Sequence, residues 1–138
     1  MSKVSGMSGF FVKPAILTAA ETLTRNNSGR THFLDNAAGF TLTLPAPLKG
    51  LELEFIVKTA PTTSNYVITT PSGTIILGGV YTNDVTNPSD SDFETSGVAT
   101  INFVKNASLR GDSIKLVSDG TNWYAKAFTA VYDGITLV

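Results

Sequence analysis

The sequence predicts an all-β fold, either an antiparallel β-sandwich or a jelly-roll-like barrel, preceded by an N-terminal arm. Apolar and polar residues alternate with a period of two along many short runs, so that every second side chain shares a face. Turn-forming residues separate these runs, a pattern typical of sandwiches and barrels. The length of 138 residues is typical of one domain. We therefore predict an arm, or a short first strand or helix, over residues 1–30 and one β-sandwich domain over residues 31–138.

The predicted elements follow one another closely along the chain. The arm holds the one helical candidate, residues 15–23, but its threonines and the preceding Pro14 weaken that helix. Residues 78–79, Gly-Gly inside an alternating run, indicate a β-bulge or a tight corner. The strand candidates are RTHFLDN, GFTLTLP, LELEFIVK, NYVITT, TIILGGVY, VATINFVK, SIKLVS, NWYAKAF and AVYDGITLV.

A hairpin is predicted around Asp119-Gly120. Two alternating runs, residues 113–118 and 122–128, flank this dipeptide. Asp-Gly is the signature of a type I′ turn, in which both central residues have positive φ. Trp123 and Tyr124 are adjacent in the second run and must point to opposite faces. We expect one of these two rings to be buried and the other to be more exposed.

The composition excludes several classes of function. The chain has no cysteine, which excludes disulfides, thiolate metal sites and cysteine nucleophiles. Its net charge of −1 provides no general attraction to nucleic acid or to anionic lipid. No apolar run approaches the roughly 20 residues that span a bilayer, and Lys13 and Pro14 interrupt any signal-peptide core. Charged residues make up 15% of the chain, against about 25% in average proteins, which favours β surfaces that pack against copies of themselves.

A long acidic segment is the candidate for metal binding. Residues 82–97 contain alternating carboxylates at Asp90, Asp92 and Glu94. Calcium prefers several such oxygen ligands, but the glycine and the later glutamate of an EF-hand are missing. We expect a solvated loop and no metal site, although calcium binding by this loop is left open.

The candidates for catalysis are few. His32 is the only histidine, no Gly-x-Ser-x-Gly motif accompanies it, and we expect a strand residue rather than a general base. Glu52 and Glu54 share a strand face at a separation that a glycosidase pair could have, but nearby lysines favour plain surface charge. The sequence therefore predicts no enzyme and no cofactor. A hydrolase that uses His32 or Glu54 is the least favoured alternative.

Three segments share the spacing of one known kind of β-module. They are GFTLTLPAPLKGLELEFIVK at 39–58, NYVITTPSGTIILGG at 65–79 and SIKLVSDGTNWYAKAF at 113–128. The pattern is similar to that of β-modules of bacteriophage virion proteins, and the turn SDGTNW is its most specific part. Such modules occur in tail fibres and in small capsid-decoration, or head-stabilising, proteins.

The resemblance implies a non-enzymatic virion component, usually a homotrimer, with no catalytic residues. Because the chain is short, begins with Met and lacks heptads or a collagen-like run for a fibre shaft, we expect a decoration protein. Such a protein is made in the host cytoplasm, binds the major capsid protein on the outside of the assembled head and bridges capsid subunits. Nucleic acid and membranes are not expected partners.

The N-terminal arm is the expected shell contact, through Phe10, Phe11, Lys13 and Ile16. Three-fold packing would bury some of these apolar residues, or Phe128, between protomers.

The alternative is a receptor-binding or carbohydrate-binding tail module. It would use exposed Tyr66, Tyr81 or Tyr124, because flat aromatic rings stack on sugar faces, together with the 82–97 segment.

Overall fold

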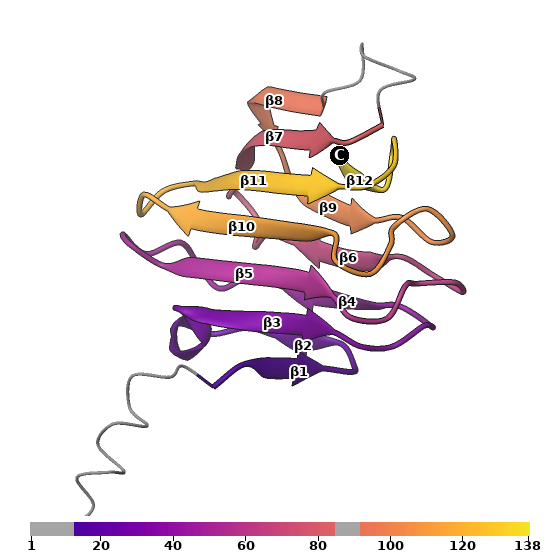
Figure 1. The fold of residues 1–138 in the computed structure, drawn as a ribbon. Coiled ribbons are helices and arrows are strands. Elements are labelled where there is room, and N and C mark those ends of the chain that lie inside the picture. The colour runs from indigo at the N-terminus through magenta and orange to yellow at the C-terminus, as the bar shows by residue number, and fades with distance from the viewer. Residues whose placement is uncertain (1–12, 85–91) are drawn as a thin grey trace, which may run out of the picture.

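The computed structural model describes residues 13–84 and 92–138, and these form a sandwich of two β-sheets (Figure 1). The all-β sandwich prediction is confirmed. The seven-stranded sheet has the order β1 (Ala15–Leu17), β3 (Arg30–Leu34), β5 (Glu52–Val57), β10 (Ser113–Ser118), β11 (Trp123–Thr129), β7 (Ile76–Thr82) and β8 (Asp92–Val98). The five-stranded sheet has the order β12 (Ile135–Leu137), β9 (Thr100–Phe103), β6 (Tyr66–Thr69), β4 (Phe40–Thr43) and β2 (Glu21–Thr22).

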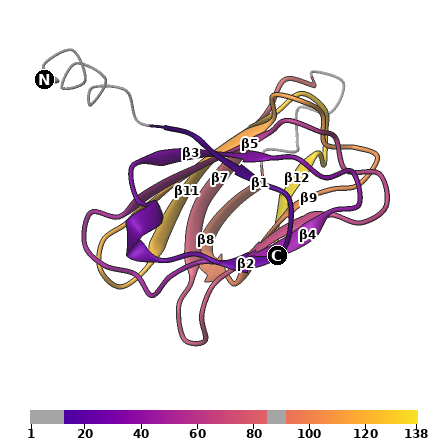
Figure 2. The ribbon, with the colours of Figure 1, turned by 90° about the horizontal axis from the view of Figure 1, so that it is seen from below.

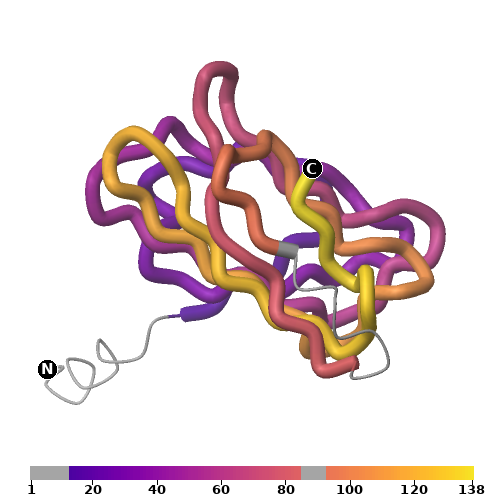
Figure 3. Tube along the Cα trace, turned by 90° about the horizontal axis from the view of Figure 1, so that it is seen from above, coloured from indigo at the N-terminus to yellow at the C-terminus, as the bar shows by residue number. Residues whose placement is uncertain are grey.

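The sheets are mixed, so the antiparallel part of the prediction is wrong. Strands β1, β3 and β5 pair in parallel in one sheet, and β2, β4 and β6 do so in the other. The chain passes from one sheet to the other after each of these strands, so that strands of the same sheet run in the same direction (Figures 2 and 3). The first half of the fold is thus wound as a coil around the core.

The described part of the predicted arm, residues 13–30, belongs to this coil. Residues 15–23, the helical candidate, form β1 and β2 instead. A short 3₁₀ turn at Arg25–Asn27 follows and leads into β3. Hydrogen bonding to the edges of both sheets outweighs the weak helix preference of this segment. No helix in the described residues is long and apolar enough to cross a membrane.

The predicted hairpin is formed by β10 and β11, but its turn is not type I′. Ser118 pairs with Trp123, so the turn spans the four residues between them. Gly120 has φ +100°, whereas Asp119 is not among the residues with positive φ. The Asp119 carboxylate accepts hydrogen bonds from the backbone N–H groups of Thr121 and Asn122, each at 2.8 Å. These side-chain bonds stabilise a longer turn in which glycine alone has positive φ.

The core lies between the sheets and is made by their inward-facing side chains. Its largest fully buried members are Trp123, Tyr66, Phe55 and Phe103. Trp123 is buried while Tyr124 is exposed, which confirms the prediction for this pair.

Gly78 forms the predicted β-bulge. The register between β7 and β8 shifts between Ile76 and Gly78, and Gly78 has φ +125°. Because β7 ends at Thr82 and β8 begins at Asp92, the predicted long loop at 82–97 is shorter than expected and its second half is a strand.

His32 is a strand residue, as predicted, and its side chain is buried. It lies on β3, is fully buried and stacks on Phe55 with ring centroids 5.1 Å apart. Its Nδ1 lies 3.1 Å from the carbonyl oxygen of Glu54, and since that oxygen can only accept, Nδ1 carries the proton. Nε2 is buried, and no hydrogen-bond partner for it is found among the described residues. Burial lowers the pKa of His32 below its ordinary value of 6.5.

Acidification below pH 6.5 is therefore expected to destabilise the fold through His32. The unfolded chain takes up a proton there while the folded chain does not, so the free energy of unfolding falls from that pH down to the lowered folded pKa. The variant His32→Leu should lose this slope, which urea unfolding at a series of pH values would measure. Equal slopes in the two proteins between pH 6.5 and the acid limit of the native state would contradict this assignment.

Candidate interaction surface

The outer faces of the two sheets differ in chemistry. On the five-stranded sheet the outward positions alternate with buried core residues, and none of them carries a charge. These positions are Thr22, Thr41, Thr43, Val67, Thr69, Thr100, Asn102 and Thr136. The outer face of the seven-stranded sheet instead combines large apolar side chains with charged ones.

An apolar row crosses the outer face of the seven-stranded sheet. Strand register places five apolar residues and one serine side by side on six neighbouring strands, β1, β3, β5, β10, β11 and β7. In that order they are Ile16, Phe33, Ile56, Ser113, Phe128 and Tyr81. Directly opposite residues on adjacent strands contact one another, so these side chains form one continuous strip, which we call the apolar row.

The apolar row is strongly exposed at both ends. Ile16 is 55% exposed, and Phe128 and Tyr81 are 54% and 49% exposed. The rings of Tyr81 and Phe128 stack at 5.5 Å. Phe93 on β8, opposite Gly79 on β7, is 62% exposed. Of the ten large apolar side chains that are exposed among the described residues, six lie on this face, the others here being Val117 and Tyr124. A contiguous apolar patch of this kind marks an interaction surface.

Charged residues beside the apolar row are segregated by strand. The acidic residues, Glu52 and Glu54, both lie on β5, and the basic residues, Lys115 and Lys126, lie on β10 and β11. Lys115 Nζ is 3.5 Å from a Glu52 carboxylate oxygen, and Thr31 donates a hydrogen bond to Glu54 at 2.9 Å. An exposed ion pair of this kind contributes little to folding. The two glutamates sit on an open sheet face, in keeping with the surface-charge interpretation.

Of the predicted shell-contact residues, Ile16 lies on this face. Ile16 is the first member of the apolar row, and Phe128, the candidate for packing between protomers, is a later member of the same row. Lys13 is exposed, and its carbonyl oxygen accepts a hydrogen bond from Arg30 Nε at 3.1 Å. Phe10 and Phe11 lie outside the described residues.

The predicted glycan-contact tyrosines do not form one site. Tyr66 is fully buried, so the expectation that it is exposed is wrong. Its hydroxyl donates to the Thr59 carbonyl oxygen at 2.7 Å and accepts from the Asn36 N–H at 2.8 Å, and burial raises its pKa. Tyr81 and Tyr124 are exposed on the seven-stranded sheet. Tyr124 donates to Asp119 at 3.1 Å, a hydrogen bond that raises the pKa of Tyr124.

The acidic segment lies only partly within the described residues. Asp90 is outside them, Asp92 opens β8, and Glu94 lies on the same strand. Within residues 13–84 and 92–138, no three His, Cys, Asp or Glu side chains are grouped as metal ligands.

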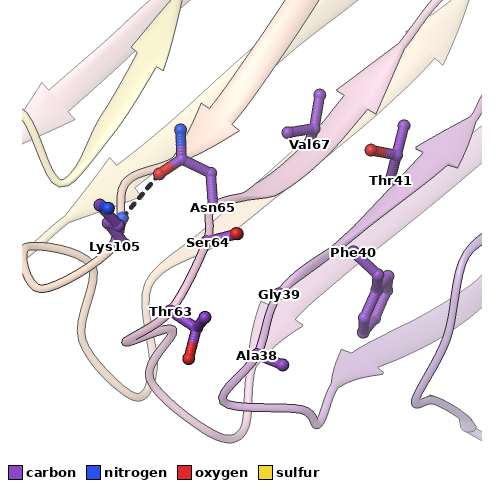
Figure 4. Close-up of a pocket in the computed structure, with 9 residues that line it drawn as sticks. All are labelled: Ala38, Gly39, Phe40, Thr41, Thr63, Ser64, Asn65, Val67 and Lys105. Atoms are coloured by element: carbon purple, nitrogen blue, oxygen red, sulfur yellow. Dashed lines mark hydrogen bonds between the residues drawn. The ribbon is translucent and has the colours of Figure 1, made fainter.

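A shallow pocket of about 530 Å³ lies at one end of the five-stranded sheet (Figure 4). Its polar lining includes Thr41, Thr63, Ser64, Asn65 and Lys105, and the Asn65 side-chain oxygen accepts a hydrogen bond from the Lys105 N–H at 2.8 Å. The aromatic residue of the lining, Phe40, packs edge-on against buried Tyr66 with ring centroids 5.0 Å apart. The pocket thus presents hydroxyl, amide and ammonium groups, with Phe40 as the one aromatic ring in its lining.

Comparisons with protein-family models, with curated proteins and with solved structures found no match to this chain.

Proposed function

We propose that this chain is a structural protein of a bacteriophage virion, a capsid decoration protein that binds the outside of the assembled head. The single observation that carries the proposal is the apolar row with its exposed aromatic end. A face that leaves Ile16, Phe93 and Phe128 more than half exposed is stabilised when another protein molecule covers it. The resemblance of residues 39–128 to virion β-modules supplies the kind of assembly, a virion, in which the major capsid protein is the proposed partner of the N-terminal segment.

The proposed mechanism is physical rather than catalytic, and the protein is proposed not to be an enzyme. Copies that bind at symmetry-related positions bridge neighbouring capsid subunits. Each copy stabilises the assembled shell by the difference between its affinity for the shell and its affinity for separate subunits. The bound form is proposed to be a homo-oligomer, for which the resemblance implies three copies. The proposed location is the capsid surface, and the shell contact begins in the N-terminal segment that leads into β1.

Deletion of residues 1–12 tests this contact. The truncated chain keeps every strand that the structure describes, so it should keep its unfolding midpoint. Its occupancy on purified shells of the virus that encodes it should fall at least tenfold. Co-sedimentation with shells measures the occupancy. The double variant Phe10→Ser/Phe11→Ser should reproduce the loss if the two rings are the anchors. Full occupancy by the truncated chain would refute the assignment of the contact to this segment.

A second candidate function, glycan binding by a tail module, is favoured by one observation. The pocket beside Thr41 and Lys105 offers several hydrogen-bonding groups in a concavity, and sugars are recognised through such groups. A glycan array tests it: specific binding that is lost in Lys105→Ala would support this function, whereas no binding on the array favours the decoration protein.

A further inference from the structure

We infer that the apolar row is the interface between two copies of this chain, whose seven-stranded sheets pack face to face about a two-fold axis along the strands. The inference rests on the proposed function in one respect, the role of this face as an assembly surface. It differs from the three-fold form that the resemblance implies. Three features of the face identify a second copy as its occupant: the order of the apolar row, the segregation of the charges and the area.

The apolar row is complementary to itself. Six strands carry it, and its midpoint lies between β5 and β10. A two-fold axis that runs along the strands at this midpoint reverses the order of the row in the second copy. Phe33 then lies opposite Phe128 of the second copy, Ile16 opposite Tyr81, and Ile56 opposite Ser113. Each exposed ring meets an apolar side chain rather than a charge, and the small serine leaves room at the centre.

The charges are complementary under the same axis. Glu54 on β5 pairs in register with Lys115 on β10 within one chain. The axis between these strands therefore places Glu54 of each copy opposite Lys115 of the other. Because the acids lie on β5 and the lysines on β10 and β11, like charges are kept apart across the interface. In an interface between two identical patches, this segregation places opposite charges, rather than like charges, against each other.

The area is sufficient for a specific contact. Six strands about 4.8 Å apart and about five residues of roughly 3.3 Å along each strand define the face. Two such faces bury on the order of 1,000 Å², which reaches the lower limit for a specific protein interface. Two sheets stacked in this way keep their strands within about 30° of each other, as the sheets of one sandwich do.

A charge-swap experiment in solution tests the inference. The native chain should have the mass of two copies, twice 14.6 kDa, by light scattering. Glu54→Lys alone brings two ammonium groups together in both contacts, and Lys115→Glu alone brings two carboxylates together, so each variant should run as a single copy. In an equal mixture of the two variants, both contacts join opposite charges only when one Glu54→Lys chain pairs with one Lys115→Glu chain. Native mass spectrometry should then find this mixed pair in excess of either pair of identical chains.

Controls and contrary outcomes separate this inference from the proposed function. Lys105→Glu and Glu21→Lys reverse exposed charges away from the face and should keep the two-copy mass. A native mass of one or three copies, or a mixture of the swapped variants that stays single, overturns the two-fold packing. A single-copy chain that still binds shells would overturn this inference alone. A two-copy chain that ignores shells would overturn the proposed function alone.

Discussion

Replacement of Gly78 by alanine is expected to destabilise the fold by about 4 kcal/mol or more. Gly78 has φ +125°, and a Cβ at this position would overlap the carbonyl oxygen of Ala125 on the neighbouring strand. β11 cannot move away, because β10 is hydrogen-bonded to its other side. The cost of backbone strain at the bulge and the cost of the overlap with Ala125 therefore add.

Gly73→Ala is the matched control for this prediction. Gly73 also has positive φ, +81°, but nothing lies within 4 Å of the Cβ position. Gly73→Ala should therefore lower the free energy of unfolding by only about 1 kcal/mol, the backbone strain of an alanine with positive φ. Urea unfolding followed by the fluorescence of buried Trp123 measures both variants. If Gly78→Ala unfolds at the same urea concentration as Gly73→Ala, the bulge does not have the close approach described here.

Replacement of Asp112 by asparagine is expected to lower the free energy of unfolding by about 3 kcal/mol, because it leaves buried hydrogen-bond donors without an acceptor. The side chain is buried, and its Oδ2 accepts hydrogen bonds from Ser108 Oγ, the Leu109 N–H and Thr129 Oγ1 at 2.9 to 3.1 Å. Its Oδ1 accepts from the Ala130 N–H at 3.0 Å. In either orientation the asparagine amide turns an N–H₂ group toward at least one of these donors. The loop before β10 and the end of β11 would lose the group that joins them.

Asp133→Asn provides the comparison for Asp112→Asn. Asp133 is exposed and has φ +56°, a conformation that asparagine tolerates. The same change of charge there should alter the free energy of unfolding by less than about 0.5 kcal/mol. Thermal unfolding of the two variants in one buffer decides the point, and equal stabilities would mean that the Asp112 hydrogen bonds do not hold the loop.

Alternation along the sequence predicted which residues share a face, because it depends only on the two-residue period of a strand. It separated Trp123 from Tyr124 correctly. Ile16 and Phe128 were expected contact residues because they are apolar, and the structure places both in the apolar row. Alternation alone could not show that they share it. It did not predict that row. The row depends on β10 and β11 lying between β5 and β7, and on the register of each pair, which contacts far apart in sequence decide.

The failures have the same origin. The chain crosses to the other sheet after β1 and after β3, and this makes β1, β3 and β5 parallel. Such crossings do not change the two-residue alternation, so the sequence pattern does not reveal them. Tyr66 was expected on the surface as a ring that could stack on a sugar, since alternation does not decide which face of a strand carries a tyrosine. The partners that allow its hydroxyl to be buried, Thr59 and Asn36, lie in loops that only the folded chain brings together.

Oxidative footprinting of the protein in its assembled form tests the central claim, that another protein molecule covers the outer face of the seven-stranded sheet. Tyr81 and Phe128 are 49% and 54% exposed in the single chain, and the loop residues Leu48 and Leu109 are 48% and 44% exposed. We predict that hydroxyl radicals modify these two aromatic rings at least several-fold more slowly in the assembled protein than in the single-copy Lys115→Glu variant. Leu48 and Leu109 should react equally in both. Undiminished reaction of the two rings in the assembled protein would contradict the account.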